Sequence, residues 1–444
     1  MREAWARLGA ELVQEGVYRA ERGGVEVLVL LTEPLVETLE EGALAQLERA
    51  LALPGLERVV VTPDVHTGYA VPIGFTAVSR THLYPDTVGP DPACSVSLSR
   101  FCAPTLDALD KPARRAILDD LETHIGVSQR RRHRRHPRIG ARLSFEELLA
   151  VVWGERRAPG TWVAGSPRLP ERFDAADLER LTSFLREAAT EATLAQIGTI
   201  GGGNHFLEVE RGQGGDHYIM AHFGSRGLGG RGSELLFARL RADQRGRCGA
   251  VAGDALLWVD ADSSLGRLYD MFQQAMLEYT SYHHGEVQRV AGDVIGRHLM
   301  PCEAPAFAGH IPHNFIEWRG GRYWQRKGAT PAYGDTTVPL LIPGSMSTAS
   351  YLLRPGPNAD RFGASVPHGA GRKLSRREAA RSLDQATMDA AFDASGAMGN
   401  FRHVPLDESS GAYKNVDEVI RAVTVSGVAE VVDRLTPLLV LKGV

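Results

Sequence analysis

Cysteine, aromatic residues and long apolar runs are all scarce in this chain of 444 residues. The four cysteines, Cys94, Cys102, Cys248 and Cys302, show no CxxC spacing and no disulfide framework, which favours a reduced compartment. Apolar runs such as 27–31 are far shorter than the about 20 residues that cross a membrane. The first residues show no signal-peptide pattern either, so we expect a cytoplasmic protein.

Positive charge is not in excess, because 50 Lys and Arg stand against 54 Asp and Glu, a net charge of −4. No overall basic field therefore indicates nucleic acid. One dense cationic run does occur at 130–138, and two interpretations of it stay open: a solvated loop, or a loop that contacts phosphates. With 43% hydrophobic and 23% charged residues, the composition is typical of a globular protein and excludes extensive disorder.

Short β-branched and apolar runs alternate with segments of helical period, which predicts an α/β fold of mixed sheets with surrounding helices. We expect strands near 25–31, 59–61, 206–210, 217–221, 255–260, 311–318 and 337–342. We expect helices near 37–53, 110–124, 144–153, 175–195, 260–299, 376–390 and 415–426. Pro63 is expected to end the strand at 59–61. Because no repeat, linker or composition shift appears, we predict one large domain over 1–444 that can include a helical lobe at about 105–195.

Several histidines stand in polar, glycine-rich contexts. The segment 201–205, Gly-Gly-Gly-Asn-His, enters a strand-like run in which alternation puts His205 on the face of Leu207. Taken singly, each such histidine is more often a hydrogen-bonded core residue, and a lone cysteine is more often a small buried hydrophobe. Taken together, a set of oxygen, sulfur and nitrogen donors could hold one or two ions of Zn²⁺, Mn²⁺ or Co²⁺. The set is Asp91, Cys94, His205, His222 and His313.

Two further glycine-rich segments suit phosphate chemistry. Gly224-Ser225-Arg226-Gly227 offers backbone N–H groups and a guanidinium fork. The segment 367–372 sets His368 beside small residues, so that a nucleotide could approach its ring without hindrance. The spacing alone does not show whether these segments meet the candidate metal ligands.

In their order along the chain, these motifs resemble the RtcB-type RNA-splicing ligases, which seal RNA ends by a guanylate-dependent route. The resemblance covers about 63–442. The segments that carry it are 63–69, 91–94, 201–208, 222–227, 313–314, 326–330, 343–346, 368–372, 412–414 and 442–443.

The resemblance implies a set of roles. Two Mn²⁺ ions would be held by Asp91, Cys94, His205, His222 and His313, with the thiolate bridging. His368 would attack the α-phosphate of GTP and become a covalent histidine–GMP, with Arg226 and Lys327 acting on phosphates. The guanylate pocket would be lined by Asn204, Glu208, Ser345, Ser350, Tyr413 and Lys442. A buried Glu208 carboxylate can accept from the N1–H and N2–H₂ edge of guanine, which favours GTP over ATP.

The resemblance also implies a reaction. A 2′,3′-cyclic phosphate would be opened to a 3′-phosphate, GMP would be transferred to it, and the 5′-hydroxyl of a second RNA strand would displace the GMP. RNA with broken ends would be the substrate, and an archease-type activator a partner. Two alternatives stay open: a 3′-end guanylyltransferase or cyclic phosphodiesterase that does not join strands, and a non-catalytic RNA-binding factor. The oligomeric state is open as well.

The chain departs from the usual family pattern at several positions close to the implied site. Pro92 and Ala93 stand where the family usually has Ile-Gly, and Ser95 stands where it has Gly. Phe223 replaces a small polar residue, and Pro367 precedes the implied nucleophile. A histidine often stands at the position of Gln325. For Asp64 and His66, a catalytic role and a role in buttressing the metal loop are equally open.

Overall fold

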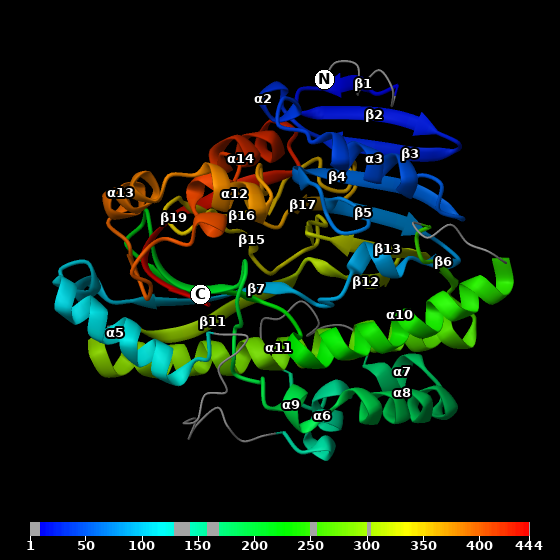
Figure 1. Cartoon of the computed structure of the whole chain (residues 1–444), viewed down its shortest axis with the longest axis horizontal. Coiled ribbons are helices and arrows are strands. Elements are labelled where there is room, and N and C mark those ends of the chain that lie inside the picture. The colour runs from blue at the N-terminus through cyan, green and yellow to red at the C-terminus, as the bar shows by residue number, and fades with distance from the viewer. Residues whose placement is uncertain (1–8, 128–142, 158–167, 249–254, 300–302, 444) are drawn as a thin grey trace.

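The computed structural model describes residues 9–127, 143–157, 168–248, 255–299 and 303–443. Two large sheets, two small ones and a set of helices make up this part of the chain, and the predicted α/β class is confirmed (Figure 1). The cationic run at 130–138 lies outside the described residues, so its two interpretations stay open.

The first sheet is built mainly from the N-terminal third of the chain. Its spatial order is β1 (Glu11–Gln14), β2 (Val17–Arg22), β3 (Val25–Leu30), β4 (Leu56–His66), β5 (Ile73–Ser79), β13 (Arg322–Lys327) and β12 (Asn314–Arg319). Neighbours are antiparallel except β3 and β4, which are parallel and are joined through α2 (Glu33–Val36) and α3 (Glu41–Ala50). Alternate residues of β3 and β4 are buried against α3 or against the second sheet.

The second sheet carries most of the glycine-rich segments. Its order is β11 (Glu303–Pro312), β7 (Ser95–Cys102), β9 (His217–Phe223), β8 (Phe206–Gly212), β19 (Ala429–Lys442), β16 (Ser350–Pro355) and β15 (Leu340–Ile342), with β18 (Met398–Gly399) parallel to β19. Two short pairs complete the strands: β6 (His82–Leu83) with β10 (Val259–Asp260), and β14 (Ala329–Pro331) with β17 (Ser365–Pro367). Since β11, β7, β9 and β8 are neighbours, their ends bring distant parts of the sequence together.

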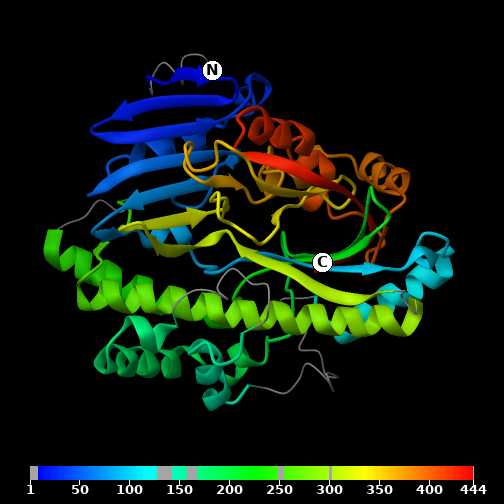
Figure 2. The same cartoon turned by 180° about the vertical axis from the view of Figure 1, so that it is seen from behind.

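Helices cover the second sheet from one side. The long α11 (Ser264–Leu299) runs along it and contacts β7, β9 and β11 (Figure 2). Five further helices pack against α11 or against one another: α6 (Phe145–Val152), α7 (Leu169–Arg172), α8 (Ala175–Ala188), α9 (Glu191–Leu194) and α10 (Arg226–Cys248). Near its C-terminal end α11 packs against α5 (Lys111–His124). The other helices are α4 (Pro85–Val88), α12 (Arg376–Ser382), α13 (Gln385–Ser395) and α14 (Val416–Val425).

Most of the predicted elements are present, and the differences have local causes. Of the segment 260–299, residues 264–299 form one continuous helix. The helix α5 begins after Asp110, whose carboxylate caps it by accepting from the N–H of Ala113. The expectation that Pro63 ends its strand is wrong, because β4 continues to His66. Pro63 is tolerated there because the pairing with β5 is interrupted between Val61 and His66, so no N–H is needed.

The segment 255–260 forms only the two-residue strand β10, and α10 was not predicted because its first turns hold four glycines. Cys102, at the end of β7, is disulfide-bonded, which the spacing of the cysteines did not predict, whereas Cys94 is a buried free thiol. Within the described ranges, no helix is long and apolar enough to cross a membrane. The division into domains stays a prediction.

Candidate active site

Five predicted metal ligands lie together at one end of the second sheet; we call them the metal-ligand cluster. They are Asp91, Cys94, His205, His222 and His313. The strand register explains the convergence: Ser95 pairs with Phe223 on one side and with Pro312 on the other, and Phe206 pairs with His222. Residues next to these pairs must therefore meet, although more than 200 residues separate the first ligand from the last.

The donor atoms of the metal-ligand cluster form two groups that share one sulfur. Cys94, His222 and His313 make one group, and Asp91, Cys94 and His205 the other, each with its donor atoms within 4.8 Å of one another. The Cys94 Sγ lies 3.3 Å from the Nε2 of His222 and 3.7 Å from that of His205. The Nε2 atoms of His222 and His313 are 3.2 Å apart, and Asp91 Oδ2 is 3.3 Å from His205 Nε2. A thiol shared by two groups suits a pair of ions.

For two of the three rings, those of His205 and His222, a backbone hydrogen bond fixes which nitrogen faces the centre of the cluster. His205 donates from Nδ1 to the backbone oxygen of Ile200 at 2.9 Å, which leaves the Nε2 lone pair for a ligand. His222 hydrogen-bonds in the same way to the backbone of Asn204. Burial lowers the pKa of His222 and of His313 well below the usual range, so both rings stay neutral. Neutral imidazoles are the form that binds a metal ion.

Burial raises the pKa of the Cys94 thiol well above its usual value, and the Asp91 charge raises it further. A bound divalent cation would reverse this effect, because a coordinated thiol loses its proton. The residues present therefore fit one or two borderline divalent ions. The donor set alone does not distinguish Mn²⁺ from Zn²⁺ or Co²⁺.

One expectation about this cluster is wrong. Alternation placed His205 on the face of Leu207, but β8 begins only at Phe206, so the alternation does not extend to His205. The His205 ring lies 5.5 Å from the His222 ring, and so does the ring of Phe206. Leu207 packs into the core on the opposite face of the sheet.

The loop that carries Asp91 and Cys94 adopts an unusual backbone conformation. Ala93 has a backbone φ of +60°, a left-handed value that residues other than glycine rarely adopt. Its N–H donates to the backbone oxygen of Asn314 at 2.6 Å, and the Ser95 hydroxyl donates to the Ala93 oxygen at 2.6 Å. The departures at 93 and 95 thus keep a glycine-like turn without glycine, and the serine adds a hydrogen bond that holds it.

His368 stands beside the metal-ligand cluster, with its ring 4.9 Å from that of His313. Its Nδ1 lies 2.6 Å from Asp64 Oδ2 and 2.9 Å from the backbone oxygen of Gly328, two acceptors that require the proton on Nδ1. The His368 backbone N–H donates to the same carboxylate oxygen at 3.2 Å. The ring is thereby held in one orientation, and in its neutral form the lone pair is on Nε2.

Asp64 is fully buried in β4 and is fixed in turn by the Thr62 hydroxyl, which donates to its other oxygen at 2.6 Å. Burial alone would raise the pKa of Asp64, but its hydrogen bond to His368 and the charge of that ring lower it. His66 makes a different contact: its Nδ1 donates to the backbone oxygen of Asp64 at 2.8 Å, and burial lowers its pKa to about 4. Of the two residues left open by the sequence, Asp64 is the one whose side chain touches His368.

The residues expected around a guanylate fall into two groups. In the first, Glu208 and its neighbour Glu210 are both buried on the same face of β8, and Ser350 donates to Glu210 Oε1 at 2.7 Å. Ser345 donates its N–H to the Thr348 hydroxyl, in the loop that leads to Ser350. Asn204 is exposed just before β8.

The second group surrounds a residue that sequence reasoning missed. Glu408 accepts from Tyr413 at 2.7 Å and forms ion pairs with Arg376 at 2.6 Å, Lys442 at 3.0 Å and Arg372 at 3.4 Å. We call these five residues the Glu408 cluster. Burial alone would raise the pKa of Glu408, but the Lys442 and Arg376 charges lower it to about 2. Glu408 belongs to a short 3-10 turn with no motif of its own, so the sequence carried no signal for it.

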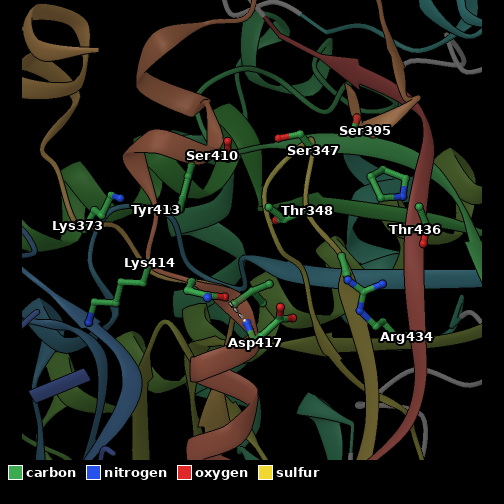
Figure 3. A pocket seen from close by; sticks show the side chains of 14 residues that line it. Ser347, Thr348, Lys373, Ser395, Ser410, Tyr413, Lys414, Asp417, Arg434 and Thr436 are labelled. Atoms are coloured by element: carbon green, nitrogen blue, oxygen red, sulfur yellow. Dashed lines mark hydrogen bonds between the residues drawn. The ribbon is translucent and has the colours of Figure 1, made fainter. Parts of the chain in front are cut away.

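A cavity of about 550 Å³ opens beside Tyr413 (Figure 3). Its walls are the loop 347–349, the start of α14 and the middle of β19. Arg434 and Asp417 bring charge to it, together with several serine and threonine hydroxyls (Figure 3). Lys414 also lines it, but its ammonium donates to the backbone oxygens of Pro63 and Val65. Because 347–349 connects Ser345 to Ser350, this cavity adjoins the residues expected to hold a guanylate.

The two remaining predicted residues lie near the loop that carries Asp91. Arg226 begins α10 with φ of +53°, and its guanidinium lies so close over Gly201 that a side chain there would overlap it. Burial lowers the pKa of Arg226, whereas the Asp91 charge raises it. Lys327 is buried and donates to the backbone oxygen of Asp86 at 3.3 Å; burial lowers its pKa to about 8. Its Nζ sits against Gly89.

The other departures from the family pattern have structural contacts. Phe223 stacks on His284, with ring centroids 3.6 Å apart and an interplanar angle of 5°. Gln325 accepts from the N–H of Tyr84 at 2.6 Å and donates to the backbone oxygen of His82 at 3.1 Å. Pro367 lies in the short strand β17, opposite Ala329.

Comparison with known proteins agrees with this geometry. The family model described as tRNA-splicing ligase RtcB matches residues 46–443. The tRNA-splicing ligase RtcB of Archaeoglobus fulgidus is 30% identical over 93% of both chains. The RNA-splicing ligase RtcB of Mycobacterium tuberculosis is 30% identical over 90% of this chain and 100% of that protein, and the tRNA-splicing ligase RtcB of Aeropyrum pernix is 27% identical over 94% and 95%. With its cysteine–histidine cluster and this extent of similarity, the chain belongs to the RtcB family of tRNA-splicing ligases.

Proposed function

We propose that this protein is a cytoplasmic, GTP- and manganese-dependent RNA ligase that joins 3′-phosphate or 2′,3′-cyclic phosphate ends to 5′-hydroxyl ends. The observation that carries the proposal is the contact of His368 with Asp64 beside the metal-ligand cluster. A ring with its Nδ1–H held by a carboxylate and its Nε2 free is a nucleophile ready for a phosphorus centre.

The metal-ligand cluster supports the part of the proposal that concerns two Mn²⁺ ions. His222 and His313 would hold one, Asp91 and His205 the other, and the Cys94 thiolate both. When bound, such ions neutralise charge that develops on phosphate oxygens. The two ions would supply most of the positive charge beside His368. Arg226, which lies close to Asp91, adds to that charge.

The first chemical step would take place on His368. Its Nε2 lone pair attacks the α-phosphorus of GTP, the bond from that phosphorus to the bridging oxygen breaks, and pyrophosphate leaves. Asp64 keeps the ring oriented through Nδ1 and stabilises the positive charge that the ring gains. The product is a phosphoramidate, His368–GMP.

The next two steps move GMP onto the RNA and off again. An oxygen of the RNA 3′-phosphate attacks the phosphorus of the adduct, and its bond to Nε2 breaks. The 5′-hydroxyl of the second strand then attacks the RNA phosphate and gives up its proton to solvent, and GMP leaves as the new phosphodiester forms. Lys327 is proposed to hold an RNA phosphate near Gly89, and an archease-type activator would assist turnover.

The guanylate is proposed to lie between the two groups of pocket residues. Glu208 would accept from the guanine edge, assisted by Ser350, while Asn204, Ser345, Tyr413 and Lys442 complete the pocket. The Glu408 cluster brings three cationic side chains against one carboxylate, an excess of positive charge that suits the phosphates of a nucleotide.

The test is guanylylation with GTP radiolabelled at the α-phosphate, in the presence of Mn²⁺, followed by a denaturing gel. We expect acid-labile label on the wild type, none on His368→Ala, and a strong reduction on Asp64→Asn. His403→Ala, which removes an exposed histidine paired with Asp389, should label like the wild type. Unlabelled wild type, with and without an archease-type activator, would overturn the proposal and favour a non-catalytic RNA-binding factor.

RNA substrates then separate joining from its alternatives. A 3′-phosphate strand and a 5′-hydroxyl strand should give a joined product. Accumulation of RNA capped with GMP at its 3′-end, without joining, would instead indicate a guanylyltransferase. Cleavage of a cyclic phosphate alone would indicate a phosphodiesterase.

A further inference from the structure

The last part of β4 is extended without regular pairing to its neighbouring strands. Its pairing with β3 ends at Val61, and its pairing with β5 is interrupted between Val61 and His66. Asp64, whose carboxylate holds His368, lies in this interrupted stretch and is fully buried. A buried backbone outside a strand ladder needs other partners for its polar groups, so other residues must hold Asp64 in place.

Two side chains take three successive carbonyls of this stretch. The Lys414 ammonium donates to the backbone oxygens of Pro63 at 3.3 Å and Val65 at 2.5 Å. The carbonyl between them, that of Asp64, accepts from His66 Nδ1 at 2.8 Å. Because successive carbonyls of an extended chain point to opposite edges, Lys414 and His66 hold the two edges of the same segment.

The main chain of Lys414 holds the loop that carries His368. Its N–H donates at 2.9 Å to the backbone oxygen of Gly371, which follows His368 in that loop. Gly371 lies so close to β4 that a Cβ there would stand 2.3 Å from the backbone oxygen of Asp64. Lys414 therefore connects the segment of Asp64, through its side chain, with the loop of His368, through its main chain.

The charge of the Lys414 ammonium is buried with that of Asp64. Lys414 is 5% exposed, and among the described residues no carboxylate forms an ion pair with it. Burial lowers its pKa to about 8, against which the charges of Asp64 and Glu40 act. When the His368 ring is neutral, the Asp64 carboxylate is a buried charge as well. A buried cation and a buried anion at one segment compensate each other, whereas either alone is left without compensation.

We propose that Lys414 is a positioning residue for the nucleophile. Its ammonium fixes the segment of Asp64, its N–H fixes the loop of His368, and together they keep the hydrogen bond between these two side chains in place when GTP binds. Lys414 touches neither GTP nor the reacting atoms. The inference rests on the proposed function, which supplies the nucleotide and the attack by His368.

The directions of two neighbouring side chains indicate which kinetic constant depends on Lys414. The Tyr413 hydroxyl donates to Glu408, among the residues proposed to surround the guanylate, whereas the Lys414 side chain extends towards the blue ribbon of the first sheet (Figure 3). Loss of the ammonium should therefore leave GTP binding intact. It should slow the attack on phosphorus, because a misplacement of about 1 Å can cost about 100-fold in rate.

The first test is the rate of adduct formation at a series of GTP concentrations, with Mn²⁺-loaded full-length protein and GTP labelled at the α-phosphate. For Lys414→Met, the rate constant at saturating GTP should fall about 100-fold. The GTP concentration at half-maximal rate should change by less than about threefold. Lys111→Met, at an exposed lysine at the start of α5, should behave like the wild type. An unchanged rate constant in Lys414→Met, with or without weaker GTP binding, overturns the proposal.

The second test is a double-mutant cycle with Asp64→Ala, which removes the carboxylate through which the Lys414 ammonium is proposed to act. In the Asp64→Ala background, Lys414→Met should slow adduct formation by less than about twofold, because the contact that it supports is already absent. A merely structural lysine would instead lower the rate by the same factor in both backgrounds. Such additive effects overturn the proposal.

Melting temperatures decide the case in which Lys414→Met does not fold. If the two buried charges compensate each other, the double variant Asp64→Ala with Lys414→Met should melt at a higher temperature than Lys414→Met alone. A double variant that melts no higher than Lys414→Met would show that Lys414 serves the fold independently of Asp64, and it overturns the proposal.

Failure of this inference and failure of the proposed function give different results. Wild type that takes up no label means that guanylylation itself is wrong. Wild type that is labelled, together with Lys414→Met that is labelled at the same rate, means that only the role of Lys414 is wrong. The melting comparison needs no nucleotide, so it tests the coupling of Lys414 to Asp64 in either case.

Discussion

The metal-ligand cluster and the Glu408 cluster are both buried and both rich in ionisable groups, but only the Glu408 cluster contains its own counter-charges. In the metal-ligand cluster, burial keeps two imidazoles and a thiol neutral, with their donor atoms 3.2–3.3 Å apart. In the Glu408 cluster, one carboxylate stands between three cations. The first arrangement suits a cation from outside, and the second suits an anion.

This difference makes opposite predictions for loss of one member. Removal of a metal ligand should affect ion binding and chemistry while the fold persists, because the neutral donors do not depend on one another for charge. Removal of Glu408 should affect the fold itself, because three cationic groups would remain without their carboxylate.

The largest effect is expected for Cys94→Ala. Loss of the shared sulfur removes a donor from both groups. Losing an outer-sphere partner of a metal costs up to about 100-fold in activity, so losing this direct ligand should lower the rate of GMP-adduct formation by well over that factor. The rise in melting temperature that Mn²⁺ gives the wild type should disappear, while the metal-free protein melts as before. Thermal melts with and without Mn²⁺, beside the labelling assay, measure both. Unchanged Mn²⁺ stabilisation in Cys94→Ala would show that the sulfur holds no ion.

Glu408→Gln should be the most destabilising single change in the Glu408 cluster. Breaking a buried ion pair by removing one partner costs about 3–5 kcal/mol in free energy of unfolding. Here the amide removes the carboxylate that three cations share, and of these Arg376 keeps its ion pair with Asp407. Asp407→Asn is the matched control, because Asp407 pairs with the same Arg376 from the surface and should cost less than about 1 kcal/mol. Urea unfolding of both variants gives the comparison. Equal losses in the free energy of unfolding for the two variants would mean that burial of Glu408 adds nothing to the strength of its ion pairs.

Acid should weaken the Glu408 cluster and the buried histidine pair His284–His310 in different pH windows. The folded-state pKa of Glu408 is about 2, below its usual value, so its stabilisation is complete above about pH 4.5 and is lost as pH falls towards 2, by about 3 kcal/mol. His310, whose ring lies 4.8 Å from that of His284, has a pKa lowered to about 3 by burial. It therefore lowers stability as pH falls below about 6.5. Unfolding followed from pH 7 to 3 should show both windows, and Glu408→Gln should lose the lower one alone.

The metal-ligand cluster could be predicted from the sequence and the Glu408 cluster could not, for a physical reason. Cysteine and histidine are rare residues, and those of the cluster lie within a few residues of glycines or prolines, so four of them together with Asp91 were a usable signal. Glutamate, arginine and lysine are common on every surface. Arg372, Arg376 and Lys442 gather around Glu408 only because β19 and the turn before α14 lie side by side in the folded chain. Nothing in their spacing along the sequence indicates it.

The same contrast between local sequence signals and tertiary contacts applies to the helices and strands. Runs of buried β-branched residues such as 25–31 predicted β3, and the helical period of 260–299 predicted α11. Errors arose where tertiary contacts override a local rule. Pro63 lies inside β4 because the neighbouring strand does not bond to it, and α10 begins with glycines because its first turn packs closely against Pro92 and Ser225. The carboxylate partner of His368 was identified only in the structure, since 304 residues separate it from that ring.

The smallest effect concerns Ala93, in the loop of the metal-ligand cluster. At φ of +60°, a residue with a Cβ carries about 1–2 kcal/mol of strain. Ala93→Gly relieves this strain, but it removes a fully buried methyl group worth about 0.8 kcal/mol. It also raises the conformational entropy of the unfolded chain, which lowers the free energy of unfolding by a similar amount. The three contributions nearly cancel, so unfolding free energy should change by less than about 1 kcal/mol, and Mn²⁺-dependent labelling should remain.

Ala93→Val is the opposing variant, because a β-branched side chain at this φ is strained further and its added methyl groups meet a packed core. It should cost at least about 2 kcal/mol, measured by the same urea titration, and weaken Mn²⁺ binding as the Cys94 sulfur shifts. A tolerated valine together with a destabilising glycine would mean that the side chain at 93, and not the left-handed turn, positions Cys94. The metal-ligand cluster would then depend on its packing more than on its backbone.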